Sequence, residues 1–148
     1  MTRYVVDASV VVKWFLPEDH TEAARRLLRH GLELSTPDLA RAEFGNVMWK
    51  RWRRGDLSAE AVDAALRYLG RLPLRIETSE PLMGAAWEVA RLYDRNFYEG
   101  LYVALAERTE CPLVTADSRL YNSVRDGDLA ERLMWVEDLD PAHRREDA

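Results

Sequence analysis

Short apolar segments alternate along this chain with longer stretches in which apolar residues recur every three or four positions. A short apolar segment is typical of a buried β-strand, and the longer spacing is typical of a helix that buries one face. The apolar segments predict strands over residues 3–6, 32–35, 74–77, 112–115 and 133–136. The helical spacing predicts helices over residues 9–15, 20–30, 37–54, 58–69, 80–93 and 98–108.

Several of the predicted helices are bounded by residues that favour capping or termination. Pro17 limits the first helix, because the residue before a proline avoids helical backbone. Gly31 and Gly55 follow the second and third helices, where a glycine adopts a left-handed end without strain. Ser58 is expected to cap the fourth helix. For Ser9, a simple cap of the first helix and support of a neighbouring acid are equally good interpretations.

The alternation of strands and helices determines the expected fold class. Strands separated by helical crossovers pair in parallel, which predicts an α/β protein, a three-layer α/β/α sandwich with a central, mainly parallel sheet. With 148 residues, the chain is long enough for one domain, which we expect over residues 1–142, with a frayed tail over residues 143–148.

The composition limits the kinds of site that the protein can contain and the cellular compartment in which we expect it. A single cysteine, Cys111, excludes an internal disulfide framework and a metal site made of cysteines alone. The first residues lack the apolar core of a signal peptide, and no apolar run approaches the roughly 20 residues that cross a bilayer. We therefore expect a soluble cytoplasmic protein that makes no contact with a membrane.

Four acidic residues stand where an apolar segment ends or a helix begins: Asp7, Glu43, Glu99 and Asp117. In a parallel α/β sheet, ligands bind beyond the carboxyl ends of the strands. Asp7 and Asp117 each follow a predicted strand, so their carboxylates are expected to meet at that edge. Several buried carboxylates need a cation between them, and oxygen ligands suit Mg²⁺ or Mn²⁺.

These segments resemble the PIN-domain ribonucleases, and within them the VapC toxins of prokaryotic toxin-antitoxin pairs. The resemblance covers almost the whole chain and rests on YVVDASVVVKWFLPE, PDLARAEFGNVMWKR and FYEGLYVALAERTECPLVTADSRL. It implies a PIN-like fold in which the four acids hold the metal and are catalytic, with the Ser9 hydroxyl supporting Asp7. The family usually has aspartate where this chain has Glu99.

The resemblance also implies the activity and the partners. We expect a Mg²⁺-dependent endoribonuclease that forms a homodimer and is bound by a cognate antitoxin across its active-site groove. Metal ions held by carboxylates activate water for phosphodiester hydrolysis without a side-chain nucleophile. Two alternatives remain: a PIN-fold module that binds RNA or antitoxin but has lost turnover through Glu99, and a flap-type or DNA-repair nuclease, which usually carries a helical arch absent here.

The charge distribution bears on RNA binding. The formal net charge is −5, yet residues 41–54 contain five basic residues and one acid, which gives +4. Basic side chains of this segment are expected to contact RNA phosphates; they are Arg41, Lys50, Arg51, Arg53 and Arg54. The competing interpretation is a solvated helix end that the helix dipole favours.

Overall fold

The computed structural model describes residues 2–29, 31–125 and 127–139. The predicted frayed tail over residues 143–148 and the predicted domain end at residue 142 lie outside these residues.

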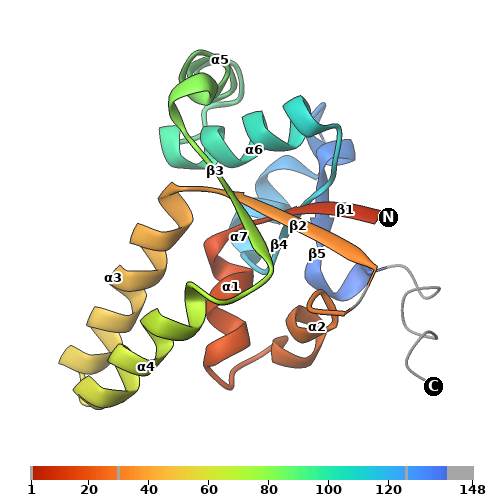
Figure 1. Cartoon of the computed structure of the whole chain (residues 1–148). Helices are drawn as coiled ribbons and strands as arrows, with labels where there is room; N and C mark the ends of the chain where they lie inside the picture. The colour runs from red at the N-terminus through yellow and green to blue at the C-terminus, as the bar shows by residue number, and fades with distance from the viewer. Residues whose placement is uncertain (1, 30, 126, 140–148) are drawn as a thin grey trace.

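A five-stranded sheet forms the centre of the molecule (Figure 1). Its strands lie in the order β3-β2-β1-β4-β5, and all four neighbouring pairs are parallel, which confirms the predicted α/β class. The strands are β1 (Thr2–Val6), β2 (Leu32–Pro37), β3 (Leu74–Glu77), β4 (Leu113–Thr115) and β5 (Leu133–Trp135).

Helices cover both faces of the sheet. In Figure 1, α5 and α6 lie above the strands, and α1 and α2 lie below them, while α3 and α4 run side by side and project away from the sheet. The α-helices are α1 (Ala8–Phe15), α2 (Thr21–Arg26), α3 (Leu39–Arg53), α4 (Ala59–Leu69), α5 (Met83–Tyr93), α6 (Phe97–Thr109) and α7 (Ser118–Val124). Short 3₁₀ turns are η1 (Glu80–Leu82), η2 (Ala130–Arg132) and η3 (Val136–Asp138).

The apolar strands bury side chains on both faces, because successive residues of a strand point in opposite directions. In β1, Val5 packs with α5 and α6, whereas Tyr4 and Val6 pack with α1 and α2. In β4, Leu113 belongs to the first cluster and Val114 to the second. Burial on both faces explains why these strands are continuously apolar rather than alternating with polar residues.

Apart from shifts of one or two residues at the ends of elements, the predicted elements differ from the observed ones in three places. Helix α2 spans Thr21–Arg26 rather than residues 20–30, because tight turns follow it at Leu27 and Leu28. A 3₁₀ turn containing Pro81 precedes α5, so residues 80–93 are not one continuous helix. Helix α7 was not predicted, since only Leu120 and Val124 of its seven residues are buried apolar side chains.

The two capping predictions have different outcomes. Ser58 caps α4, where its hydroxyl accepts a hydrogen bond from the Ala61 amide at 3.1 Å. Ser9 lies inside α1 and is not its cap; Asp7 caps that helix instead. Gly55 follows α3 with a φ of 83°, a left-handed conformation that glycine adopts without strain.

Candidate active site

The carboxyl ends of β1 and β4 lie side by side at the point where the strand order reverses direction. From β1, the chain continues to β2 on one side, and β4 pairs with β1 on the other side. Such a switch point is where open α/β sheets bind ligands. Asp7 directly follows β1 and Asp117 closely follows β4, so the fold brings these two acids to one edge.

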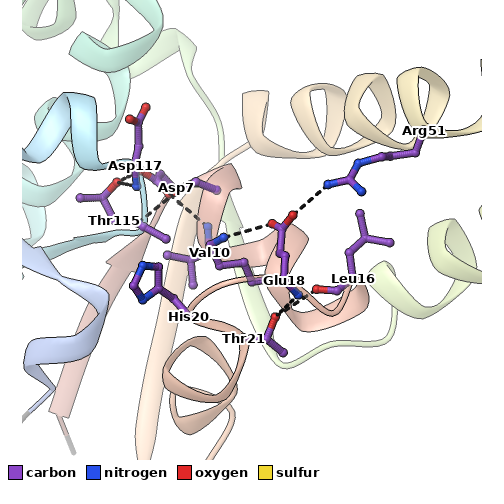
Figure 2. Close-up of polar contacts among 12 residues, drawn as sticks. Asp7, Val10, Leu16, Glu18, His20, Thr21, Arg51, Thr115 and Asp117 are labelled. Atoms are coloured by element: carbon purple, nitrogen blue, oxygen red, sulfur yellow. Dashed lines mark hydrogen bonds and ion pairs between the residues drawn. The ribbon is translucent and has the colours of Figure 1, made fainter. Parts of the chain in front are cut away.

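Three groups hold the Asp7 carboxylate in place. Its Oδ1 accepts hydrogen bonds from the Ser9 hydroxyl and, at 3.3 Å, from the Val10 amide. Its Oδ2 accepts a hydrogen bond from Thr115 Oγ1 at 2.5 Å, which Figure 2 shows as a link from β4 to the start of α1. Ser9 Oγ also accepts a hydrogen bond from the Ala116 amide at 3.1 Å, so Asp7 and Ser9 tie α1 to the end of β4.

Asp117 combines a place at the site with a capping role. Its Oδ1 accepts hydrogen bonds from the amides of Arg119 at 3.0 Å and Leu120 at 3.2 Å, which caps α7. Its own amide donates to Thr115 Oγ1 at 3.0 Å. Thr115 therefore contacts both aspartates and sets their relative position.

Glu43 reaches the same site from α3. Burial raises the pKa of Glu43 to about 7; the negative charges of Asp7 and Glu99 act in the same direction, and the Tyr102 hydroxyl opposes them. Burial likewise raises the pKa of Asp7 to about 6, despite its hydrogen bonds from Ser9, Thr115 and Val10. The carboxylates are thus close enough to repel one another.

Tyr102 of α6 is buried against these acids. Burial raises its pKa far above the ordinary value, and the charges of Glu43 and Asp7 add to the effect. Its hydroxyl lies near Glu43, but no group among the described residues meets normal hydrogen-bond geometry with it. A buried donor without a well-placed partner is costly, which is consistent with a site completed by a ligand.

Glu99 lies in the first turn of α6. Asn96 caps this helix by accepting a hydrogen bond from the Glu99 amide at 2.8 Å. The Glu99 carboxylate is 3.6 Å from Nε of Arg95, with both side chains about a quarter exposed. Glu99 stands where the resembling family usually has aspartate, and its carboxylate is already paired with Arg95.

All four predicted acids line one open cavity of about 210 Å³. Ser9, Asn96, Tyr98 and Tyr102 also line it. Within the ranges that the structure describes, no three acidic, histidine or cysteine side chains are gathered closely enough, as they stand, to enclose an ion. The donor set nevertheless fits a hard divalent cation, because it consists of carboxylate oxygens whose repulsion a cation would relieve.

Several residues of the site were not singled out from the sequence. Thr115, Asn96, Tyr102 and Arg95 are all missed neighbours of the acids. Thr115 carries a usable signal, since a polar residue at the end of an apolar strand needs a buried partner. Tyr102 and Arg95 carry none, because their proximity to the acids arises only from the packing of α6 against the sheet.

The basic residues predicted to contact RNA lie outside the acidic cavity. Arg53 packs over the Trp49 ring with its guanidinium 5.5 Å from the ring centroid. Arg54 pairs with Asp56 at 3.3 Å. Arg51 is different, because it pairs with Glu18 at 2.8 Å and lines a second cavity beside Glu43. Lys50 and Arg41 are exposed on α3.

A larger cavity of about 440 Å³ lies away from the four acids, around the starts of β1 and β2 and the end of α6. Both of its acids are paired: Glu33 with Arg3 at 3.1 Å, and Glu77 with Arg75 at 2.8 Å. The acidic cavity, where four carboxylates converge and Arg95 pairs with Glu99 alone, is the better candidate for chemistry.

Comparisons with known proteins agree with the fold described above. The family model of the PIN domain matches residues 4–125. Ribonuclease VapC3 of Pyrobaculum aerophilum is 33% identical over 120 residues, which are 80% of this chain and 92% of that protein. The crystal structure of PAE2754 from Pyrobaculum aerophilum is similar with a TM-score of 0.71 and 25% identity, and the match covers 97% of this chain and 90% of that one.

A further solved structure shares the fold alone. It is VapBC2 from Rickettsia felis bound to a DNA fragment from their promoter, with a TM-score of 0.65 at 14% identity, covering 90% of this chain and 98% of that one. Within the part of the chain that the structure describes, no helix is both long enough and apolar enough to cross a bilayer.

Proposed function

The chain belongs to the PIN-domain family, among the VapC ribonucleases of toxin-antitoxin pairs, and we propose that it hydrolyses RNA phosphodiester bonds at the acidic cavity with Mg²⁺, or Mn²⁺ in its place. One observation carries the proposal. Asp7 and Asp117 leave the adjacent strands β1 and β4 and share one cavity with Glu43 and Glu99. The raised pKa values of Asp7 and Glu43 support a site that a cation completes.

The four acids have different tasks in this proposal. When bound, the metal supplies a water of lowered pKa and stabilises charge on the leaving oxygen. Asp7 is held by Ser9 and Thr115, so it is the most rigid of the four ligands. Asp117 uses Oδ1 to cap α7, which leaves Oδ2 for the metal. Glu43 and Glu99 complete the ligand set from α3 and α6.

Tyr102 has a supporting role. Because its pKa is raised, the hydroxyl keeps its proton at any physiological pH and can donate a hydrogen bond. The hydroxyl lowers the pKa of the nearby Glu43 carboxylate, so Tyr102 favours the ionised form that a metal requires.

We further propose an RNA substrate, a cognate antitoxin and a homodimer as the partners of this chain. The solved VapBC2 complex supports the antitoxin, and exposed aromatic side chains support protein interfaces. Trp49, Trp52 and Trp87 are 46%, 48% and 57% exposed. Among the described tryptophans, only Trp14 is buried. The mass of the purified protein in light scattering tests the dimer.

A cytoplasmic location is also proposed. The single cysteine, Cys111, is free and buried, which is compatible with a reducing compartment.

Substitution of the aspartates tests the proposed function. Asp7→Asn and Asp117→Asn should each lower Mg²⁺-dependent RNA cleavage by roughly 100-fold or more, because a displaced or missing catalytic group costs about that much. Asparagine retains the acceptor that caps each helix, so thermal unfolding without metal should not occur at a lower temperature.

The control is Asp63→Asn, which changes an exposed acid on α4 and should leave cleavage unchanged. Full cleavage by Asp117→Asn, or cleavage that persists in a chelator, would contradict the proposal. A lower unfolding temperature in both variants would mean that the two aspartates serve the fold alone.

A further inference from the structure

A second open cavity, of about 340 Å³, adjoins the acidic cavity. The two cavities share Ala8, Ser9 and Glu43, so they meet at the wall formed by the start of α1 and by α3. We refer to the second cavity as the flanking groove. It extends from Glu43 along α1 and α3 to Lys13 and Arg51.

Two cations from different helices share one carboxylate in the flanking groove. Glu18 Oε1 is 3.1 Å from Lys13 Nζ, and Glu18 Oε2 is 2.8 Å from Arg51 Nη2. The Lys13 side chain is only 11% exposed, and those of Glu18 and Arg51 are 28% and 30% exposed. This end of the groove therefore carries a net charge of +1 directly beside an acidic cavity.

A tight turn holds Glu18 in position. The Glu18 amide donates to Thr21 Oγ1 at 3.0 Å, and the same hydroxyl donates to the Leu16 carbonyl at 3.1 Å. Figure 2 shows this turn below Glu18, whose carboxylate points toward Arg51 on α3. The turn fixes the backbone of Glu18, and the two ion pairs of its carboxylate orient Lys13 and Arg51 before any ligand arrives, which lowers the entropy cost of binding.

The floor of the groove is apolar. Val12 of α1, Val47 of α3 and Ala116 after β4 line the groove together with the acids and the cations. A strand of nucleic acid presents both features in turn, since its ribose and base surfaces are partly apolar and its phosphates are anionic.

We propose that the flanking groove binds the RNA strand next to the bond that is cleaved, with Lys13 and Arg51 contacting one of its phosphate groups and Val12 and Val47 contacting the adjoining nucleoside. The inference rests on the proposed ribonuclease function and adds the path of the substrate to it. Charge complementarity selects RNA as the occupant: the end of the groove formed by Lys13, Arg51 and Glu18 has a net charge of +1, which attracts phosphate and disfavours an arginine-bearing protein segment.

The proposal separates Arg51 from the other basic residues of α3. Arg53 and Arg54 are engaged with Trp49 and Asp56, and neither lines the flanking groove. Lys13, by contrast, joins Arg51 although it lies far from the basic segment in the sequence.

RNA binding in the absence of turnover tests this inference. All variants are made in the Asp117→Asn background and titrated with a fluorescein-labelled single-stranded RNA of mixed sequence in Mg²⁺ at several salt concentrations. Lys13→Gln and Arg51→Gln should each weaken binding and lower the slope of log affinity against log salt by roughly 0.7, the value for one lost phosphate contact on a single strand. The controls Lys50→Gln, near the end of α3, and Arg54→Gln, directly after it, remove charges outside the groove and should leave the slope unchanged.

Charge-retaining variants guard against a purely structural effect. Lys13→Arg and Arg51→Lys keep the cations and should retain the salt slope, whereas a structural defect would weaken binding in these variants as well. Unaltered slopes for Lys13→Gln and Arg51→Gln overturn the inference and leave the groove as a surface for a protein partner. Failure of the ribonuclease function is a separate result, seen when the wild-type protein does not cleave RNA in Mg²⁺.

Discussion

Glu99 is bound differently from the other three acids of the site. Asp7 and Asp117 accept hydrogen bonds from neighbouring backbone or hydroxyl groups, whereas the Glu99 carboxylate lies 3.6 Å from the guanidinium of Arg95. Arg95 is itself anchored, because it donates hydrogen bonds to Ser123 and to the Asp94 carbonyl. Under the proposed function, Arg95 would therefore compete with the metal for the Glu99 carboxylate.

We predict that removal of the Arg95 charge favours metal binding at Glu99. Arg95→Gln should lower the Mg²⁺ concentration needed for half-maximal cleavage by about two- to fivefold, since a partly exposed ion pair contributes up to about 1 kcal/mol. Arg91→Gln, which removes an arginine paired with Glu88 on the exposed face of α5, is the matched control. A higher Mg²⁺ requirement would show that Arg95 orients Glu99 for the metal instead of competing with it.

Shortening the side chain tests the same residue independently. If Glu99 binds the metal less well than aspartate would, Glu99→Asp increases cleavage in a Mg²⁺ titration. If Glu99→Asp and Glu99→Gln both match the wild type, Glu99 does not belong to the site.

At the scale of the elements, the position of α6 depends on a close approach to α5. A Cβ atom at Gly100 would lie 2.5 Å from the Ala86 carbonyl oxygen, too close for the two backbones as they stand. Since α6 carries both Glu99 and Tyr102, this contact also positions one wall of the acidic cavity.

Gly100→Ala should therefore destabilise the protein by about 1–3 kcal/mol, the usual cost of overpacking, and should also impair cleavage as α6 shifts. Urea unfolding and an RNA cleavage assay measure the two effects. The control is Gly45→Ala in α3, where nothing lies within 4 Å of the added Cβ; it should stabilise the protein by roughly 0.5–1 kcal/mol through helix propensity. Equal stabilities of the two variants would contradict the proposed close approach.

For the whole molecule, the acidic cavity should make folding stability depend on pH and, under the proposed function, on metal. The pKa of Asp7 rises from 3.8 in the unfolded chain to about 6, and that of Glu43 from 4.5 to about 7. Between roughly pH 4 and pH 7, the native protein therefore binds more protons than the unfolded chain, so the free energy of unfolding falls as pH rises. One pKa unit corresponds to about 1.4 kcal/mol, so the buried Asp7 alone contributes on the order of a few kcal/mol.

The metal-free protein should thus be more stable at pH 5 than at pH 8, and Mg²⁺ should reduce the difference by favouring the ionised carboxylates. Urea unfolding in chelator and in Mg²⁺ at both pH values measures this. Asp7→Asn removes one of the titrating groups and should flatten the pH dependence. If the free energy of unfolding in chelator rises between pH 5 and pH 8, the burial and mutual repulsion of the ionised carboxylates do not control the pH dependence.

By itself, the sequence determined the class of the fold and predicted the acids that line the acidic cavity. The apolar pattern was sufficient for strands such as β4, predicted over residues 112–115 and observed over Leu113–Thr115, because continuous apolar segments must be buried on both faces of a parallel sheet. Asp7 and Asp117 were predictable for a related reason: a carboxylate directly after a buried strand has a fixed direction, toward the carboxyl edge of the sheet.

Only the tertiary structure decided which other side chains meet these acids. Lys13 and Arg51 are joined through Glu18, a contact that depends on how α1 packs against α3 and that no local pattern records. The ion pair between Arg95 and Glu99 and the burial of Tyr102 likewise follow from the placement of α6. Local spacing determines the face of a helix or strand on which a residue lies, whereas distances between elements depend on the packing of the whole core.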